Sequence, residues 1–407
     1  MDPTPQWLLV VVLIASVSTA LQLILAACAL RLLSRSAPPG PTPPITIFKP
    51  LKGLDEGLYE NLVSLLRQDY PEFELILGVA DPRDPALVVA HQLKREFSKA
   101  RVRIVVGAPD RHGNPKVANL LSMSAAARYE WWLISDANVR VDPDYLTSIA
   151  AHADDPRVGL VTNLVVGRGS KTLGAQLENL QLNATILPSV AGAYLVANRA
   201  CVVGKSMLLR RGALESIGGL ERALPYLAED YLLGRWLENA GFRVAVSGYP
   251  VATINGKWSV RRFLSRHLRW NQLRRRVLPW VFAGEILINP SALWLIVLVA
   301  TGFGGPLSWL ALAAMTARYG GDILILARLR TPITFLTPLL LMVKDATQLA
   351  LWLTTWCTQT VHWRGQSLRL GPLSYIESFA PLGLSRRRAS IAAGPALVRR
   401  LAVEDEQ

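Results

Sequence analysis

Short apolar runs alternate with longer segments of helical period from residue 45 onward. The strand-like runs occupy residues 45–48, 74–79 and 102–106, and the helix-like segments between them occupy residues 56–67 and 85–99. Strands that alternate with helices in this way are typical of βαβ units. We therefore expect an α/β domain with a mainly parallel sheet over residues 45–276.

The second half of this domain has a less regular pattern. A strand is indicated at residues 158–166, a helix at residues 173–187 and a further strand at residues 201–209. Asp81 and Asp136 come directly after apolar runs in the first half, at the end of a sheet where ligands of open α/β folds bind. This position makes both carboxylates candidate site residues.

The chain starts with a long apolar segment. Residues 7–30 are 24 positions without a charge, which at about 1.5 Å per residue is enough to cross a bilayer core. A secretory signal is the alternative, but the segment is too long and begins with Asp2 in place of basic residues. We expect a transmembrane anchor at residues 1–34 and a Pro-rich linker at residues 35–44. Arginines follow the anchor, so the next domain is expected to face the cytoplasm.

Further apolar segments come after residue 276. They share a length near that of a membrane or interfacial helix and occupy residues 277–288, 292–314 and 333–357. Two to four membrane segments in total fit this pattern, and we favour four, in a membrane region at residues 277–360. Lys344 and Asp345 interrupt the last segment and are expected to pair or to line an access route for lipid. A basic tail follows at residues 361–407, outside the membrane after four crossings and inside after three.

Composition narrows the possible partners. The 407 residues are 51% hydrophobic and carry a net charge of +14. No basic and aromatic nucleic-acid module is visible, so contact with a membrane is the better account of this charge, and no nucleic-acid partner is expected. The three cysteines, Cys28, Cys201 and Cys357, are scattered, which predicts neither a disulfide framework nor a zinc site.

Several polar side chains suit glycosyl transfer from a nucleotide-sugar. That reaction needs a base for the attacking hydroxyl and positive charge on the departing diphosphate. Asp230 is the candidate base and Glu229 the alternative, although an acid at this place can also be a helix cap or a surface residue. Arg266, Arg269 and Trp270 lie on one face of a predicted helix and offer donors and a flat ring. The competing interpretation is a basic flank beside a membrane segment.

Asp136 with Asn138 is the candidate metal site. Mg²⁺ and Mn²⁺ favour oxygen ligands, and a cation here would bridge the phosphates of a nucleotide. One carboxylate and one amide oxygen form a small ligand set. An isolated aspartate after a strand is also a common turn residue.

A series of short motifs occurs in one order along the chain. The motifs are Lys49-Pro50-Leu51-Lys52-Gly53, Asp81 with Asp84-Pro85-Ala86, Asn114-Pro115-Lys116 with Asn119-Leu120, Asp136, residues 201–210, Ala228-Glu229-Asp230-Tyr231, and Arg266 to Trp270. Over roughly residues 45–290 this series resembles the ceramide glucosyltransferase family, which are inverting enzymes of the GT-A fold. Each motif is weak alone, and their combination is specific.

The resemblance implies roles on the nucleotide side. Asp81 would meet the uridine of UDP, Lys116 would lie near the nucleotide or its phosphates, and Asp136 would lie at the diphosphate and the metal. Lys49, in the first motif, is grouped with these nucleotide-binding residues. Broader relatives carry a second aspartate where this chain has Asn138, so a requirement for Mg²⁺ or Mn²⁺ is left open.

The resemblance also implies a reaction. Asp230 would be the general base, and Arg266, Arg269 and Trp270 would form the acceptor and diphosphate side. Polymerising relatives tend to have Gln where Arg266 stands, which favours transfer of a single sugar. The expected activity is transfer of glucose from UDP-glucose to ceramide, giving β-glucosylceramide.

Three alternatives to this activity stay open. They are transfer to another lipid such as a hopanoid or diacylglycerol, a processive polysaccharide synthase, and a membrane scaffold without activity. The Arg-rich and Ala-rich composition favours a bacterial inner membrane, and a Golgi membrane would suit a eukaryote.

Overall fold

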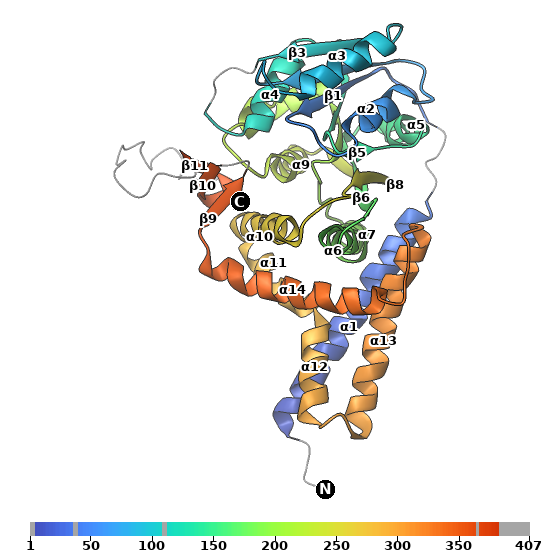
Figure 1. Cartoon of the computed structure of the whole chain (residues 1–407), viewed down its shortest axis with the longest axis vertical. Coiled ribbons are helices and arrows are strands. Elements are labelled where there is room, and N and C mark those ends of the chain that lie inside the picture. Colours follow the sequence, from blue (N-terminus) through green and yellow to red (C-terminus); the bar gives the residue numbers. More distant parts are fainter. Residues whose placement is uncertain (1–4, 36–39, 108–111, 364–365, 382–407) are drawn as a thin grey trace.

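A sheet domain stands on a bundle of membrane-type helices in the computed structural model, which describes residues 5–35, 40–107, 112–363 and 366–381 (Figure 1). The bundle consists of α1 (Gln6–Leu33), α12 (Pro290–Ala300) and α13 (Gly305–Arg328). Another long helix, α14 (Thr337–Cys357), lies across the end of the bundle, between it and the sheet domain.

The central sheet has eight strands in the order β3-β2-β1-β4-β7-β6-β8-β5. Their bounds are β1 Ile45–Leu51, β2 Phe73–Val79, β3 Val102–Val106, β4 Trp131–Ser135, β5 Val139–Arg140, β6 Val158–Arg168, β7 Ser206–Arg210 and β8 Arg243–Ile254. The first four strands in this order are parallel, β6 and β8 are also parallel, and β7 and β5 run antiparallel to their neighbours. The prediction of an α/β domain with a mainly parallel sheet is confirmed.

Helices cover both faces of this sheet, and the strands are apolar on both sides for that reason. Along β1, Ile47 packs with the cluster under α2 (Leu58–Leu66), α3 (Ala86–Glu96) and α5 (Tyr145–Ala150), whereas Phe48 packs with the opposite cluster. The opposite cluster includes residues of α4 (Pro115–Ser124), α8 (Arg211–Ser216) and α9 (Glu229–Asn239). Alternate residues along each strand therefore pack into two separate cores, one on each face of the sheet.

Two elements of the middle region differ from the sequence prediction. The helix expected at residues 173–187 extends further, as α6 (Leu173–Gln181), a π turn η2 (Leu182–Ile186) and α7 (Leu187–Leu195). The strand expected from residue 201 begins only at Ser206, and the preceding residues form a loop along the cavity described below. In that loop the backbone N–H of Gly204 donates to Asp230 Oδ2, and its carbonyl accepts from Lys116 Nζ.

The described helices include fewer candidate membrane spans than the four segments favoured from the sequence. Among the described residues, α1 and α13 are long and apolar enough to span a bilayer. Pro279–Ile288 and Pro290–Ala300 form a bent pair of helices, with an angle of 45° between them. If this pair is one broken span, it is a third candidate. The pair comprises α11 (Pro279–Gly284), η4 (Glu285–Ile288) and α12.

The apolar stretch at residues 292–314 is divided between two helices. It contains most of α12, a turn around Gly302 and Phe303, and the start of α13. Gly302 has φ 60° and Phe303 φ 59°, so the chain reverses there through left-handed backbone. α12 also packs against α1, where Trp294 donates its indole N–H to Thr19 Oγ1 over 2.8 Å.

The C-terminal part returns to the sheet domain. After α14 come β9 (Thr360–Trp363), β10 (Gln366–Leu370), η5 (Pro372–Ser374) and β11 (Ile376–Pro381), and the three strands form a second, antiparallel sheet. Its apolar residues pack with Leu227 and Leu273 of the sheet domain. Residues 361–363 and 366–381 are therefore folded where a basic tail was expected, and they lie on the same side of the helix bundle as the sheet domain (Figure 1). The arginines at positions 386–388 and 399–400 lie outside the described residues.

The remaining helices complete the framework. They are α10 (Val260–Val277), which follows β8, and the short helices η1 (Ala151–Asp154) and η3 (Glu221–Ala223). Ser259 caps α10 by accepting a hydrogen bond from the backbone N–H of Arg262. This cap starts the helix that carries Arg266, Arg269 and Trp270.

Candidate active site

One continuous cavity of about 1370 Å³ joins the sheet domain to the membrane-type helices. Its lining residues run from Asp81 and Asp136, after β2 and β4, to Gln22 of α1, Arg318 of α13 and Asp345 of α14. A pocket for one small ligand is typically about 300–1,000 Å³. This cavity therefore has room for two reactants, one polar at the sheet and one reaching the membrane helices.

Asp136 is held between two ammonium groups. Its Oδ1 lies 3.0 Å from Lys116 Nζ, and its Oδ2 lies 2.9 Å from Lys205 Nζ. Burial would raise the pKa of Asp136, but the two ammonium groups outweigh it and keep this pKa below its ordinary value. Asp136 is therefore a carboxylate at neutral pH, and the sheet end carries a compact group of charges.

Lys116 is the second residue of α4 and connects this group to α9. Asn114 caps α4, since its Oδ1 accepts a 2.9 Å hydrogen bond from the backbone N–H of Lys116. The Lys116 ammonium also lies 3.1 Å from Glu229 Oε1. Burial alone would lower the pKa of Lys116, but the nearby carboxylates outweigh it and raise this pKa. Lys116 therefore stays positively charged inside the cavity.

Lys205 occupies the place that we expected for a metal. Its ammonium donates to Asn138 Oδ1 over 2.7 Å and pairs with Asp136. Among the described residues there is also no group of three His, Cys, Asp or Glu side chains that could hold a metal. The donor set of Asp136 and Asn138 does not fit Mg²⁺ or Mn²⁺, because its oxygens already meet protein cations.

Lys205 was not singled out by the sequence analysis. It lies within the motif at residues 201–210, but only the folded chain brings it to Asp136. Burial lowers the pKa of Lys205, and Asp136 partly offsets this effect. Two lysines from different elements thus supply the positive charge at this end of the cavity.

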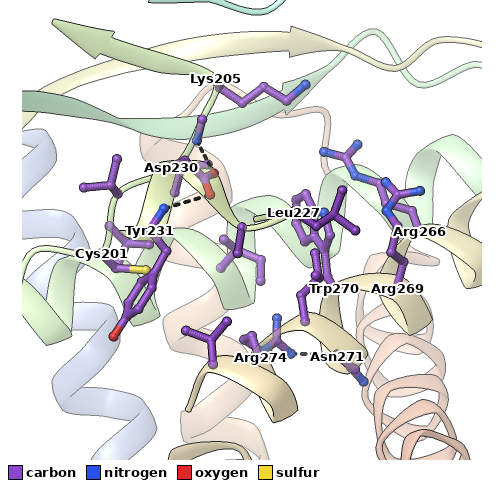
Figure 2. Close-up of a pocket in the computed structure, with 18 of the residues that line it drawn as sticks. Cys201, Lys205, Leu227, Asp230, Tyr231, Arg266, Arg269, Trp270, Asn271 and Arg274 are labelled. Atoms are coloured by element: carbon purple, nitrogen blue, oxygen red, sulfur yellow. Dashed lines mark hydrogen bonds between the residues drawn. The ribbon is translucent and has the colours of Figure 1, made fainter. Parts of the chain in front are cut away.

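Asp230 lies at the start of α9 and faces the cavity. Its Oδ2 accepts a 2.7 Å hydrogen bond from the backbone N–H of Gly204, and its Oδ1 accepts one of 2.8 Å from Tyr231 (Figure 2). These two donors fix the orientation of the carboxylate. A carboxylate fixed at the wall of a cavity can accept a proton from a bound hydroxyl.

Glu229, the alternative base, already forms an ion pair and a hydrogen bond with other residues of the protein. It is 6% exposed, pairs with Lys116 and accepts a 2.8 Å hydrogen bond from Asn114 Nδ2. Burial raises the pKa of Glu229, and the charge of Asp230 acts in the same direction. These contacts tie α9 to α4, so Asp230 is better placed than Glu229 to act on a ligand.

The loop before Asp230 is fastened by the C-terminal sheet. Ser374 accepts the backbone N–H of Leu227 at its carbonyl over 3.1 Å and the N–H of Ala228 at its Oγ over 3.0 Å. Ser374 is fully buried and has φ 67°, a strained backbone conformation for a residue with a side chain. No local pattern at residues 361–381 predicted this contact.

Arg266, Arg269 and Trp270 all line the cavity from α10 (Figure 2). Arg266 pairs with Glu178 over 2.9 Å, and its guanidinium lies 4.3 Å from the ring centre of Trp270. Glu178 is fully buried on α6, and its role was not predicted from the sequence. Arg266 is therefore part of a rigid wall that sets the position of Trp270.

Asp81 and Lys49 lie at the edge of this arrangement. Asp81 lines the cavity with a side chain that is 55% exposed, and it lies 3.4 Å from Arg83. Lys49 is not among the lining residues; it points into the core, where it donates to Ser135 Oγ over 3.0 Å and to the carbonyl of Val139 over 3.3 Å. Burial lowers its pKa to about 7. Direct contact of Lys49 with a nucleotide does not fit this position.

Comparisons of the sequence with known proteins indicate the family. The profile of glycosyl transferase family 21 matches residues 7–375. Ceramide glucosyltransferase 3 of Caenorhabditis elegans is 30% identical over 257 residues, which cover 62% of this chain and 55% of the relative. Ceramide glucosyltransferase of Komagataella phaffii is 29% identical over 303 residues, 58% of either chain. The chain thus spans little more than half the length of these relatives.

A solved structure supports the fold. Mannosyltransferase PcManGT from Pyrobaculum calidifontis, in complex with GDP-Man and Mn²⁺, covers 86% of this chain and 99% of its own with a TM-score of 0.51. The two sequences are 17% identical, so this similarity concerns the fold. The GT-A fold predicted from the sequence is confirmed.

Proposed function

The chain belongs to glycosyl transferase family 21, and from this membership we propose that it transfers glucose from UDP-glucose to the primary hydroxyl of ceramide. The product would be β-glucosylceramide. The curated relatives that are named as ceramide glucosyltransferases support the choice of acceptor and sugar.

The observation that carries this proposal is that one continuous cavity extends from the sheet end to the membrane-type helices. Asp230 stands between the charged end, with Lys116 and Lys205, and a wall of apolar residues next to the membrane-type helices. The apolar lining includes Val277, Val281, Ile286, Leu349 and Trp352. A water-soluble nucleotide-sugar and a lipid could therefore meet at one carboxylate.

In the proposed reaction, Asp230 takes the proton of the primary hydroxyl as its oxygen attacks C1 of glucose. The new C1–O bond forms on the face of the sugar opposite UDP. The bond between C1 and UDP breaks, and UDP leaves with its electron pair. The α-linkage of the donor therefore becomes a β-linkage in the product. Lys116 and Lys205 offset the charge that develops on the diphosphate, and Arg269 is placed on the acceptor and diphosphate side. Asp81 is assigned to the uridine end.

The membrane helices are proposed to hold the sheet domain against the bilayer, with this domain in the cytoplasm. Arg31 and Arg35 at the end of α1 support this orientation through the positive-inside rule. A lipid then needs to expose only its head group to the cavity. Spans by α1, the bent pair and α13 also leave the C-terminal sheet on the side of Asp230.

The test is transfer by the detergent-solubilised full chain. Labelled UDP-glucose is offered with ceramide, diacylglycerol or a hopanoid in parallel, and products are identified by mass. A monohexosyl product with ceramide is the expected result. A product formed only with another lipid would change the assigned acceptor. Products of many sugar units would indicate a polysaccharide synthase. No turnover of any UDP-sugar would refute the proposal that the protein is an enzyme.

A further inference from the structure

The charged residues of α14 are covered by protein, whereas its exposed face is apolar. The buried residues include both charges of the helix and are Thr337, Leu341, Lys344, Asp345, Leu351 and Thr355. The opposite face exposes an apolar stripe, which consists of Leu339, Met342, Val343, Ala346, Ala350 and Leu353. A helix on the surface of a water-soluble domain has the reverse arrangement. The stripe therefore suits contact with an apolar medium.

Both ends of α14 are hydrogen-bonded to the sheet domain. Before the helix, Thr331 Oγ1 accepts from Asn183 Nδ2 over 3.2 Å, and the same amide bonds the carbonyl of Gly167 on β6. After the helix, Gln272 of α10 donates its Nε2 to Thr358 Oγ1 over 3.0 Å. The 21 residues of α14 make it about 31 Å long. Crossing the bilayer would place its two ends on opposite sides, which these bonds do not allow.

The middle of α14 is held on the same side. Lys344 donates to Thr185 Oγ1 of η2 over 2.7 Å and pairs with Asp345 over 2.7 Å. Asp345 in turn lies 2.8 Å from Arg318 of α13. Because charged groups inside a membrane protein face protein and not lipid, these pairs fix the covered face and turn the stripe outward. Figure 1 shows that α14 runs across the end of the bundle and not along it.

Side chains at the two ends of the stripe suit the surface of a bilayer. Phe335, just before α14, is 90% exposed. At the other end Trp356 is exposed, and the guanidinium of Arg275 lies 5.6 Å from its ring centre. Arg275 also donates to the carbonyl of Thr355 over 2.7 Å, which satisfies part of the last turn of the helix. Tryptophan and arginine are typical of the boundary between acyl chains and head groups.

We infer that α14 is an in-plane helix whose apolar stripe contacts bilayer lipids at the boundary between acyl chains and head groups. The occupant of the stripe is lipid because the helix lies at the end of α1, α12 and α13, where a bilayer around those helices has its surface (Figure 1). Leu349 and Trp352 of the same helix line the cavity, so this contact also fixes how far the cavity lies from the membrane. The inference holds for any sugar and any acceptor.

The test measures the depth of spin labels on the full chain in nanodiscs. Native cysteines other than the labelled one are replaced by alanine, and the labelled positions are Cys357 and, in turn, Leu339→Cys, Ala346→Cys and Leu353→Cys. Accessibility to oxygen, which dissolves in lipid, is compared with accessibility to a water-soluble nickel chelate. All four labels should lie at one shallow depth, within about 5.4 Å or one helical turn of each other.

Two sets of positions calibrate this measurement. Leu9→Cys and Val17→Cys lie at exposed positions of α1, where the second label should be about 12 Å deeper than the first because a crossing helix rises about 1.5 Å per residue. Val88→Cys is the matched control in water. Val88 is apolar and exposed like the stripe, but it belongs to α3, at the end of the sheet domain away from the bundle (Figure 1). Its label should be reached by the chelate.

Three results would overturn the inference. In a crossing helix the label at position 346 would lie about 10 Å deeper than those at 339 and 353. Labels that the chelate reaches as readily as the one at position 88 would place the stripe in water. Labels reached by neither reagent would show that protein covers it. Unchanged Tm confirms the fold of each variant, and Met342→Cys or Ala350→Cys replaces any variant whose Tm falls.

Discussion

Gly204 donates its backbone N–H to Oδ2 of Asp230 over 2.7 Å, and this contact depends on the absence of a side chain at position 204. A Cβ there would lie 2.8 Å from that oxygen and 3.1 Å from Lys116 Nζ. The loop before β7 therefore sets the distance between the candidate base and the charged end of the cavity.

Gly204→Ala is expected to reduce transfer by about 10²-fold, because the new methyl group displaces the Asp230 carboxylate from its place. Steady-state kinetics with UDP-glucose and ceramide would measure this loss. Gly284→Ala is the matched control, since a Cβ at Gly284 meets nothing within 4 Å. Equal turnover by both variants would show that the Gly204 contact is not needed.

Asp230→Asn is expected to lower transfer by about 10²–10⁴-fold, the range associated with loss of a general base. The amide is close in size to the carboxylate but cannot take the proton of the hydroxyl. UDP-glucose affinity, measured by calorimetry, should stay within a few-fold of wild type. Near-normal turnover in this variant would refute the assignment of the base, and Glu229→Gln would then be the next variant to compare.

Removal of divalent metal is expected to leave most of the wild-type activity. Lys205 already holds the oxygens of Asp136 and Asn138, so its ammonium supplies the charge expected from a cation. Transfer is measured with and without a chelator in wild type and Lys205→Met. The variant should lose about 10²-fold in turnover. Loss of wild-type activity on chelation, with recovery on adding Mn²⁺, would contradict this prediction.

Lys49 should make stability depend on pH. Burial lowers the pKa of Lys49 in the folded chain from its ordinary 10.5 to about 7. Between these values the unfolded state binds more protons, so the contribution of Lys49 to folding improves as pH rises from about 7 to 10. The free energy of unfolding of wild type, relative to Lys49→Met, should therefore increase over this window. Parallel pH profiles of the two proteins would show that Lys49 does not titrate there.

The sequence predicted the elements whose pattern is local. The first four strands appear as apolar runs because both faces of each strand are buried. Asp81 and Asp136 could be singled out because each follows one of these runs. The α/β class, the long apolar helix α1 and the helix with Arg266 and Trp270 could be predicted from local patterns, and the GT-A fold was implied by the family resemblance.

Residues defined by long-range pairing could not be predicted. Lys205 meets Asp136 through neighbouring antiparallel strands, and Glu178 meets Arg266 through packing of α6 on α10. Arg318 and Asp345 lie on different helices and pair with each other in the fold. The length and apolarity of a segment do not show where it packs, so the pattern could not fix how many segments cross the membrane.

The two hydrogen bonds that the loop before Asp230 donates to Ser374 can form only late in synthesis. Ser374 comes after all the membrane-type helices in the order of synthesis. A growing chain with a complete central sheet still lacks these bonds until α14 has been made and the last strands have folded back. The loop that presents the base is therefore completed only when the whole membrane part of the protein exists.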